Sequence, residues 1–227
     1  MKVIILAAGQ GKRLETYTQG KPKCLLKLGN ETILEREIRL LKECGFTDMD
    51  IYIVGGYQYH LLEPYAKNLI INDKYNIKDN SYSLGLALEI INDDILVLDA
   101  DLCFDVNIIK EILIHKEKNV LLSKKSNDLL ESTGIVTTEL ERVLKVGKEY
   151  KNTGYIYISI FKMEKERISE FRKLLLNEKN EVTWYTRAIT ELCEKYKFYN
   201  CVTESLWSEI DFVEDYIETL QLFHLEK

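Results

Sequence analysis

Hydrophobic and polar positions in the first hundred residues follow two alternating periods, and these periods predict a series of strands and helices. Short apolar runs rich in β-branched residues predict strands over 2–7, 50–54, 68–72 and 95–99. Apolar positions with helical spacing predict helices between them, over 32–44, 58–66 and 82–91. Strands that alternate with helices favour a parallel sheet, because parallel neighbours need a long crossover connection.

The pattern changes after residue 119, where strand-like runs follow one another without long helical segments between them. These runs cover 119–123, 133–138, 142–147 and 154–161. Their short connections favour a mixed or antiparallel extension of the sheet. Beyond them the spacing predicts helices over 163–177 and 182–195, a strand over 198–202 and a last helix over 212–224. With no linker or repeat, residues 1–227 are interpreted as one domain.

A glycine-rich segment directly after the first strand is the most informative chemical feature of the chain. Gly9 and Gly11 lack side chains, so the backbone N–H groups beside them can approach an anion closely. The cations that follow supply the countercharge: Lys12, Arg13, Lys21 and Lys23. A solvated basic loop is the plain alternative, but charge runs rarely come framed by glycines after a buried strand. The segment therefore predicts a binding site for nucleotide phosphates.

Two common glycine loops do not fit the spacing of this segment. A Walker loop needs four residues between its glycines, whereas only Gln10 separates Gly9 from Gly11. The dinucleotide fingerprint would need a third glycine where the chain has Leu14. The specific feature is the order along the chain: a strand, Ala-Ala-Gly-x-Gly-x-Arg-Leu, a short polar gap and then Pro-Lys-x-Leu-Leu.

Acidic residues mark a second predicted site. Asp99 and Asp101 end the strand over 95–99, at the sheet edge where open α/β sheets bind ligands. Positions i and i+2 of an extended chain share a face, and carboxylate oxygens suit Mg²⁺. Mg²⁺ takes one or two protein carboxylates beside phosphate oxygens, so a distant acid such as Asp211 could be a second ligand, although by itself Asp211 fits a helix cap as well. A turn cap at Asp99 and a helix cap at Asp211 are the structural alternatives.

The glycine segment and the block that follows it, over 1–28, resemble the signature of nucleotidyltransferases that join a nucleoside triphosphate to a phosphorylated small molecule. Further blocks are similar to the phosphocholine and phosphonate cytidylyltransferase branch, and they lie in order at 22–26, 32–36, 54–57, 80–84, 99–101 and 207–211. One departure is Thr16-Tyr17-Thr18, where this family commonly has Pro-Leu-Thr. The resemblance implies a Rossmann-like three-layer α/β sandwich with a central, mostly parallel sheet.

The resemblance also implies roles for individual residues. Transfer of CMP from CTP to a small phosphate or phosphonate acceptor depends mainly on positioning and charge neutralisation. Arg13 is assigned to the β- and γ-phosphates, Lys23 to the α-phosphate and the acceptor oxyanion, and Lys12 to the general field of the loop. Mg²⁺ is assigned to Asp101 and Asp211. The nucleotide-binding set comprises Leu6, Ala7, Ala8, Gly9, Gly11, Gly56, Tyr57, Asn80 and Ser83.

The implied acceptor is a phosphorylated or phosphonylated amine such as phosphocholine or 2-aminoethylphosphonate, whose cationic head group would meet aromatic faces and acids. The residues assigned to it are Asp99, Tyr155, Trp184 and Trp207. Further candidates are Glu131, Glu149, Tyr150 and Tyr185. A sugar-1-phosphate nucleotidyltransferase with a uridylyl or guanylyl donor is the alternative enzyme. A catalytically silent nucleotide-binding regulatory protein is the alternative from another class.

Composition narrows the setting of this chemistry. Of 227 residues, 46% are hydrophobic and 30% are charged, which is typical of a soluble enzyme with a sizeable core. The net charge of -6 disfavours nucleic acid as a partner. Five cysteines without a C-x-x-C pair, and no apolar run of membrane-spanning length, favour a cytoplasmic location without membrane insertion. The oligomeric state is left open, with a homodimer as one option.

Overall fold

Parallel strands form the first part of the main sheet in the computed structural model, which describes residues 1–126, 133–180 and 183–225. The central strand is β1 (Lys2–Ala7), and it pairs in parallel with two others, β4 (Ile51–Gly55) and β6 (Ile95–Asp99). The edge strand β5 (Asn68–Ile71) pairs in parallel with β4. The four strands predicted from the early apolar runs are therefore confirmed, and their carboxyl ends lie at one edge of the sheet.

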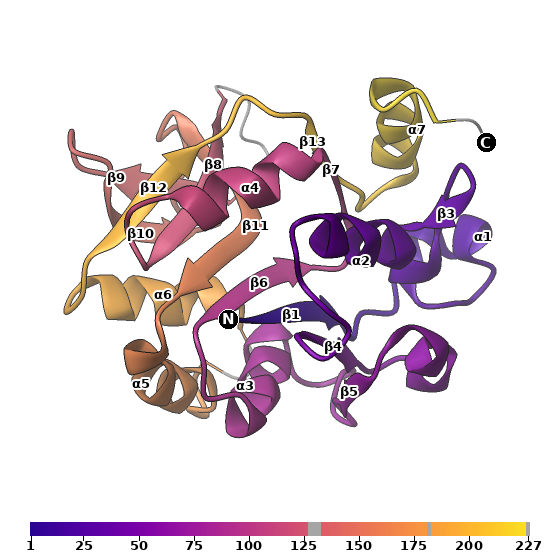
Figure 1. The fold of residues 1–227 in the computed structure, drawn as a ribbon, viewed down its shortest axis with the longest axis horizontal. Coiled ribbons are helices and arrows are strands. Elements are labelled where there is room, and N and C mark those ends of the chain that lie inside the picture. Colours follow the sequence, from indigo (N-terminus) through magenta and orange to yellow (C-terminus); the bar gives the residue numbers. More distant parts are fainter. Residues whose placement is uncertain (127–132, 181–182, 226–227) are drawn as a thin grey trace.

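The remaining strands of the sheet form a mixed extension, as the change of pattern after residue 119 predicts. The long strand β11 (Tyr155–Met163) runs antiparallel to β6 and carries the sheet onward to β8 (Val120–Lys125), β12 (Phe198–Val202), β10 (Arg142–Gly147) and β9 (Gly134–Thr137). β12 is parallel to β8, whereas β10 is antiparallel to both its neighbours. Within the described ranges the order is β5-β4-β1-β6-β11-β8-β12-β10-β9 (Figure 1).

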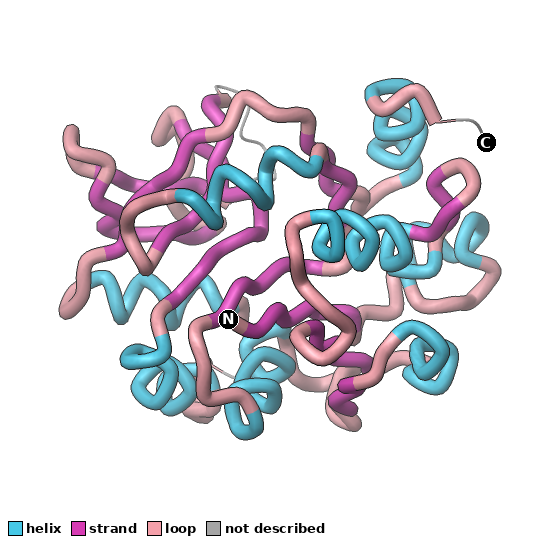
Figure 2. The backbone as a smooth tube through the Cα atoms, viewed as in Figure 1, coloured by secondary structure: helices cyan, strands magenta, loops and turns pink. Residues whose placement is uncertain are grey.

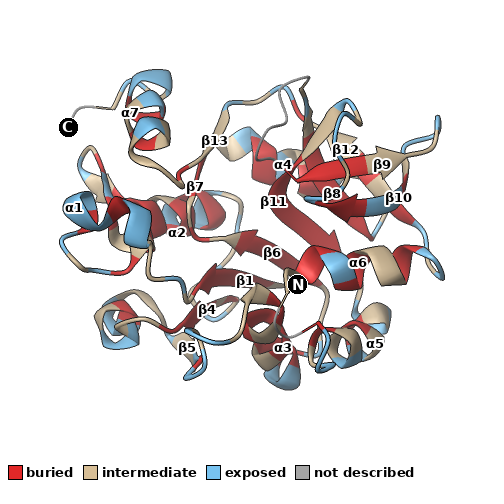
Figure 3. Cartoon of the chain, turned by 180° about the vertical axis from the view of Figure 1, so that it is seen from behind, coloured by how far each residue is buried: buried red, intermediate tan, exposed pale blue. Residues whose placement is uncertain are grey.

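Helices cover both faces of this sheet, so the molecule has three layers (Figures 1 and 2). Val3 and Ile5 of β1 belong to a core cluster with two helices, α2 (Ile33–Glu43) and α4 (Val106–Ile114). Ile4 and Leu6 belong to a second cluster with three helices, α3 (Asn80–Ile90), α5 (Lys165–Leu175) and α6 (Tyr185–Cys193). The strand's period of two thus sends alternate side chains into opposite layers. The buried sheet between the helices is visible in Figure 3.

A third, smaller core joins the two ends of the chain. It contains residues from the segment after β1, including Leu14 and Leu26, together with Ile210, Tyr216 and Leu220. The elements around it are short: η1 (Lys12–Leu14), α1 (Glu15–Thr18), η2 (Lys23–Leu25), β2 (Lys27–Leu28), β3 (Glu31–Thr32) and the last helix α7 (Val213–Leu222). The C-terminal helix therefore packs directly on the predicted phosphate loop.

Several local features differ from the sequence prediction or extend it. The helical pattern over 58–66 is the 3₁₀ helix η3 (Tyr59–Tyr65), and it contains Pro64, which has no N–H for an α-helical ladder. The helix α4 and a pair of short antiparallel strands, β7 (Leu102–Phe104) and β13 (Trp207–Glu209), were not predicted. Among the described residues, no helix combines the length and the hydropathy that a membrane crossing requires.

Candidate active site

A cavity of about 290 Å³ opens at the carboxyl ends of β1 and β6. Ten of the residues proposed from the sequence line it: Leu6, Ala8, Gly9, Arg13, Asn80, Ser83, Asp99, Asp101, Trp184 and Asp211. They come from five separate parts of the chain. The cavity therefore lies where ligands bind in open α/β sheets, and it brings the glycine loop together with both acidic blocks.

Gly11 allows the loop after β1 to fold back on the segment around Lys23. The backbone of Gly11 has φ +67°, which side-chain-bearing residues rarely adopt, and a Cβ atom there would lie 2.6 Å from Lys23 Cβ. Gly9 differs, because a Cβ atom at that position would meet nothing within 4 Å. Gly11 is thus required by the fold, whereas Gly9 leaves open space beside the cavity for a ligand.

Lys23 connects the two acids assigned to the metal. Its Nζ donates to Asp101 Oδ2 at 2.9 Å and to Asp211 Oδ1 at 2.6 Å, and its side chain is only 13% exposed. Burial alone would lower the pKa of Lys23, but the two carboxylates outweigh it and hold that pKa above its usual value. The geometry therefore brings three of the proposed site residues, from distant parts of the sequence, around one point.

The β7–β13 pair explains how Asp211 reaches Asp101, although the two are 110 positions apart in the sequence. Glu209 is paired with Leu102, and the Ile210 N–H donates to the Asp101 carbonyl at 3.0 Å. Beyond this pair, the Asp215 carboxylate accepts the N–H of Asp211 at 2.9 Å. Backbone bonds therefore fix both metal-candidate acids, so their separation does not depend on side-chain contacts alone.

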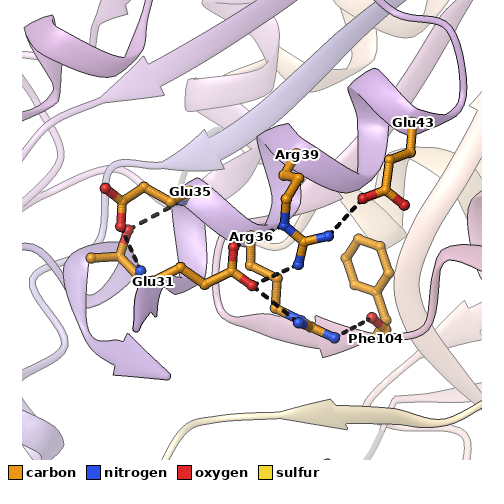
Figure 4. A network of polar contacts seen from close by, with 7 residues as sticks. Glu31, Glu35, Arg36, Arg39, Glu43 and Phe104 are labelled. Atoms are coloured by element: carbon orange, nitrogen blue, oxygen red, sulfur yellow. Dashed lines mark hydrogen bonds and ion pairs between the residues drawn. The ribbon is translucent and has the colours of Figure 1, made fainter. Parts of the chain in front are cut away.

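Arg36 of α2 supports the β7 strand from behind. Its guanidinium donates to Glu31 Oε1 at 3.1 Å and to the Phe104 carbonyl at 3.4 Å, and Arg39 adds further bonds to Glu31 (Figure 4). The Thr32 side chain and Glu35 form the capping box that begins α2, as their spacing predicts. This network fixes the position of α2 against the strand that leads out of the Asp101 turn.

The carboxyl groups of the cavity differ in how readily they ionise. Glu209 also lines the cavity, and burial together with the charges of Asp101 and Asp211 raises the pKa of Glu209 to about 8. Burial and Asp101 also raise the pKa of Asp99 well above its usual value. The pKa of Asp211 is lowered: burial raises it, but Lys23 and, further off, Arg13 outweigh that effect. Clustered carboxylates of this kind provide a favourable field for additional positive charge.

The donor set fits Mg²⁺ bound jointly by protein and nucleotide. Within the described residues, no three His, Cys, Asp or Glu side chains are arranged to hold a metal by themselves. Asp101 and Asp211 nevertheless bracket one cation already, and Asp101 Oδ1 is buried without a hydrogen-bond partner. Because Mg²⁺ usually takes one or two carboxylates and completes its shell with water and phosphate oxygens, this pair is sufficient.

Three cationic side chains of the loop occupy different places. Arg13 lines the cavity, and its guanidinium carbon lies 4.5 Å from the centre of the Phe212 ring. Lys23 is bound between the acids, as described above. Lys12 is exposed and does not belong to the cavity lining. The structure therefore separates the three cations that the sequence places together.

The far end of the cavity is polar and is built on α3. Asn72 Nδ2 donates to Ser83 Oγ at 2.9 Å, and the side-chain Oδ1 of Asn80 accepts the N–H of Tyr185 at 3.0 Å. Gly56 lets the chain after β4 approach closely, since a Cβ atom there would lie 2.6 Å from Tyr75 Cβ and 2.8 Å from the Ala8 carbonyl. Gly56 thus shapes the wall of the cavity without lining it.

The structure does not bring every proposed residue to the cavity. Tyr57 does not line it: its ring meets the Tyr75 ring edge to face, and its hydroxyl donates to the Gly20 carbonyl at 3.0 Å, which supports the loop. Tyr155 packs on the α3–α5–α6 core, and Trp207 packs on the α2–α4 core and lines a separate groove beside α7. Neither Tyr155 nor Trp207 lines this cavity, so their contact with an acceptor stays a prediction. Ala7 is also buried in the core, and Glu131 lies outside the described residues.

Sequence reasoning missed several residues of the cavity wall: Asn72, Tyr75, Lys78, Asp79, Lys148 and Glu209. Glu209 had a signal, because it lies two positions before Asp211 in the same block and alternate residues of a strand share a face. Lys148 had none. It comes from the end of β10, and its Nζ lies 3.7 Å from the centre of the Trp184 ring.

Comparison with known proteins places this site in a family context. The model of a family described as the MobA-like NTP transferase domain matches residues 3–154. The chain is 27% identical to the CTP:phosphoglutamine cytidylyltransferase of Campylobacter jejuni, over 95% of this chain and 97% of that protein. It is 33% identical to the choline-phosphate cytidylyltransferase of Haemophilus influenzae, over 97% of each. The solved CTP:phosphocholine cytidylyltransferase LicC of Streptococcus pneumoniae has a TM-score of 0.82 and 26% identity, covering 98% of both chains.

Proposed function

The chain belongs to the MobA-like NTP transferase family, and on that premise we propose that it is a Mg²⁺-dependent cytidylyltransferase acting on a small phosphorylated or phosphonylated amine. The observation that carries the proposal is Lys23, held between Asp101 and Asp211 beside a cavity that also contains Arg13 and the glycine loop. Named cytidylyltransferases that align with nearly the whole chain support CTP as the donor.

The proposed reaction is a single displacement at the α-phosphorus of CTP. An oxygen of the acceptor phosphate or phosphonate forms a bond to that phosphorus, and the bond from the α-phosphorus to the oxygen bridging to the β-phosphate breaks. Pyrophosphate leaves with that oxygen and its electron pair. A phosphate dianion is already nucleophilic at neutral pH, so no general base is required. Catalysis then depends on aligning the reactants and balancing their negative charge.

Each cationic side chain of the site is proposed to neutralise a different phosphate, according to its position. Arg13, at the cavity wall, is proposed to bind the β- and γ-phosphates through its guanidinium N–H donors. The buried ammonium of Lys23 is proposed to meet the α-phosphate and the acceptor oxyanion. Asp101 and Asp211 would hold Mg²⁺, which supplies positive charge to the α-phosphate when it is bound. The open space beside Gly9 supports close approach of phosphate to the loop.

Trp184 and the acids near it support an acceptor with a cationic head group. The Lys148 ammonium lies 3.7 Å from the centre of the Trp184 ring, so this ring already accepts a cation. Asp99 and Glu209 line the same cavity and can supply countercharge when ionised. The proposed acceptor class therefore includes phosphocholine and 2-aminoethylphosphonate, with phosphorylated glutamine as a further member suggested by one relative's name.

An acceptor screen tests this function. The protein, CTP and Mg²⁺ are combined in turn with phosphocholine, 2-aminoethylphosphonate, a phosphorylated glutamine and glucose-1-phosphate, and kcat/KM is obtained from pyrophosphate release. We expect one of the three nitrogen-containing acceptors to be preferred. A preference for glucose-1-phosphate would support the sugar-1-phosphate nucleotidyltransferase instead, and absence of turnover with every acceptor would favour a silent nucleotide-binding protein.

Replacing Trp184 by leucine is expected to raise the KM of a cationic acceptor about two- to thirtyfold, because the ring's cation–π attraction is lost while an apolar side chain remains. The KM for CTP should change little. Steady-state kinetics with each substrate varied separately measures both constants. Trp207→Leu is the matched control, because Trp207 lies in a separate groove. Equal acceptor defects in the two variants would contradict a role of Trp184 in acceptor binding.

A further inference from the structure

Two aromatic contacts join the start of α7 to the segment that follows the glycine loop. The Arg13 guanidinium carbon lies 4.5 Å from the centre of the Phe212 ring. The Tyr17 and Tyr216 rings meet edge to face, with their centroids 5.1 Å apart. In both segments the two residues are four positions apart, which is one helical turn. The two contacts therefore lie one helical turn apart and pack the segment at 13–17 against the segment at 212–216.

The backbone at Phe212 is fixed by several hydrogen bonds. Its backbone N–H donates to Asp215 Oδ2 at 2.7 Å, and the same oxygen accepts the N–H of Asp211 at 2.9 Å. One helical turn further along, the Tyr216 hydroxyl donates to the Lys27 carbonyl at 3.0 Å. Phe212 is also the next residue after a carboxylate that Lys23 contacts. The chain at Phe212 is thus held in a defined place relative to the acidic centre, and from there the ring reaches the Arg13 guanidinium.

Arg13, in contrast, is an exposed side chain on a short 3₁₀ turn. A long guanidinium side chain in this setting has many rotamers, and ordering it when a ligand binds reduces affinity. Contact with the face of an aromatic ring restricts the Arg13 side chain to a few of these rotamers. It also leaves the N–H donors at the guanidinium edge available for oxygen ligands, which an ion pair with a carboxylate would consume.

We propose that Phe212 is a positioning residue that holds the Arg13 guanidinium at the cavity wall, ready to receive the triphosphate of the nucleotide. This inference rests on the proposed function, in which Arg13 binds the β- and γ-phosphates. Phe212 itself touches no reacting atom in this account. It acts through Arg13, so the C-terminal helix contributes to nucleotide affinity as well as carrying Asp211 at its beginning.

Phe212→Leu tests the inference, with CTP affinity as the readout. The variant keeps an apolar side chain but loses the ring face, so we expect the Kd for CTP, measured by calorimetry, and the KM for CTP to rise about two- to fivefold. The kcat should change less than twofold. Phe212→Tyr, which retains the ring face, should restore the wild-type Kd. Phe223→Leu is the matched control, because Phe223 lies at the other end of α7 with Arg36 5.4 Å from its ring centre.

A double-mutant cycle separates positioning from a general structural effect. In an Arg13→Ala background, Phe212→Leu should produce no further change in the Kd for CTP, because the guanidinium it positions is gone. The inference is overturned if Phe212→Leu leaves the Kd unchanged, lowers it, or raises it equally in both backgrounds. If Arg13→Ala alone leaves the Kd unchanged, the phosphate role of Arg13 in the proposed function is wrong. If Arg13→Ala raises the Kd but Phe212→Leu does not, only the positioning is wrong.

Discussion

Asp101→Asn and Asp211→Asn are each expected to lower kcat about 100-fold or more, in a chain that folds normally. Asparagine preserves the shape of the side chain and one acceptor oxygen but removes the negative charge. In each variant Lys23 retains one carboxylate partner, so the buried ammonium is still compensated. What is lost is one of the two ligands proposed to bring Mg²⁺ to the α-phosphate.

The kcat measured as a function of Mg²⁺ concentration tests the expected loss of activity, and the melting temperature tests whether each variant folds normally. The Mg²⁺ concentration for half-maximal rate should rise in both variants. Asp48→Asn is the matched control, because Asp48 also pairs with a lysine, Lys42 at 2.7 Å, but lies on the surface away from the cavity. Near-wild-type turnover of either cavity variant at saturating Mg²⁺ would contradict the metal assignment.

Replacement of the three loop cations by alanine is expected to give three different results. Lys23→Ala should lower kcat about 100-fold or more, because a buried positive charge beside the reacting phosphate is removed. Arg13→Ala should raise the KM for CTP about 10- to 100-fold, the usual cost of losing charged hydrogen bonds. Lys12→Ala should change kcat/KM by about fivefold at most, since Lys12 is exposed and outside the cavity lining.

Steady-state kinetics in CTP, with a melting curve for each variant, distinguish these outcomes. Lys23→Ala also leaves Asp101 and Asp211 without their shared partner, so some loss of stability is expected. For that reason the decisive comparison is kcat measured well below the melting transition. Equal defects in kcat/KM for all three variants would contradict the separation of roles that the geometry supports.

The fold was largely predictable because its signals are local. β1 and β6 are continuous apolar runs bounded by polar residues, and Thr32 with Glu35 begins α2 at the predicted place. The β7–β13 pair was not predictable in this way. Each strand has three residues, too few for a period to show, and their pairing joins segments about 100 positions apart. The interpretation of residues 1–227 as one domain stays a prediction.

The candidate site was predictable where its residues lie in compact blocks. The glycine loop, Asp101 and Asp211 follow strand ends or precede a helix, and the cavity is lined by both acids together with Ala8, Gly9 and Arg13 of the loop. Trp207 does not line the cavity, although alternate residues of a strand share a face and Glu209 of the same strand does; with Glu209 it lines the groove beside α7. Lys148 and Tyr75 reach the cavity from separate segments through tertiary packing, which neither composition nor spacing indicates.

The most direct measurement of the central claim is product analysis after the wild-type protein has been incubated with CTP, Mg²⁺ and phosphocholine or another acceptor preferred in the screen. Phosphorus NMR, with mass spectrometry of the same samples, identifies the products, and Asp101→Asn provides the inactive comparison. The account predicts pyrophosphate and a CMP–acceptor conjugate in equal amounts, formed faster from CTP than from UTP, GTP or ATP. Formation of free CMP without a conjugate, or faster transfer from another nucleotide, would contradict it.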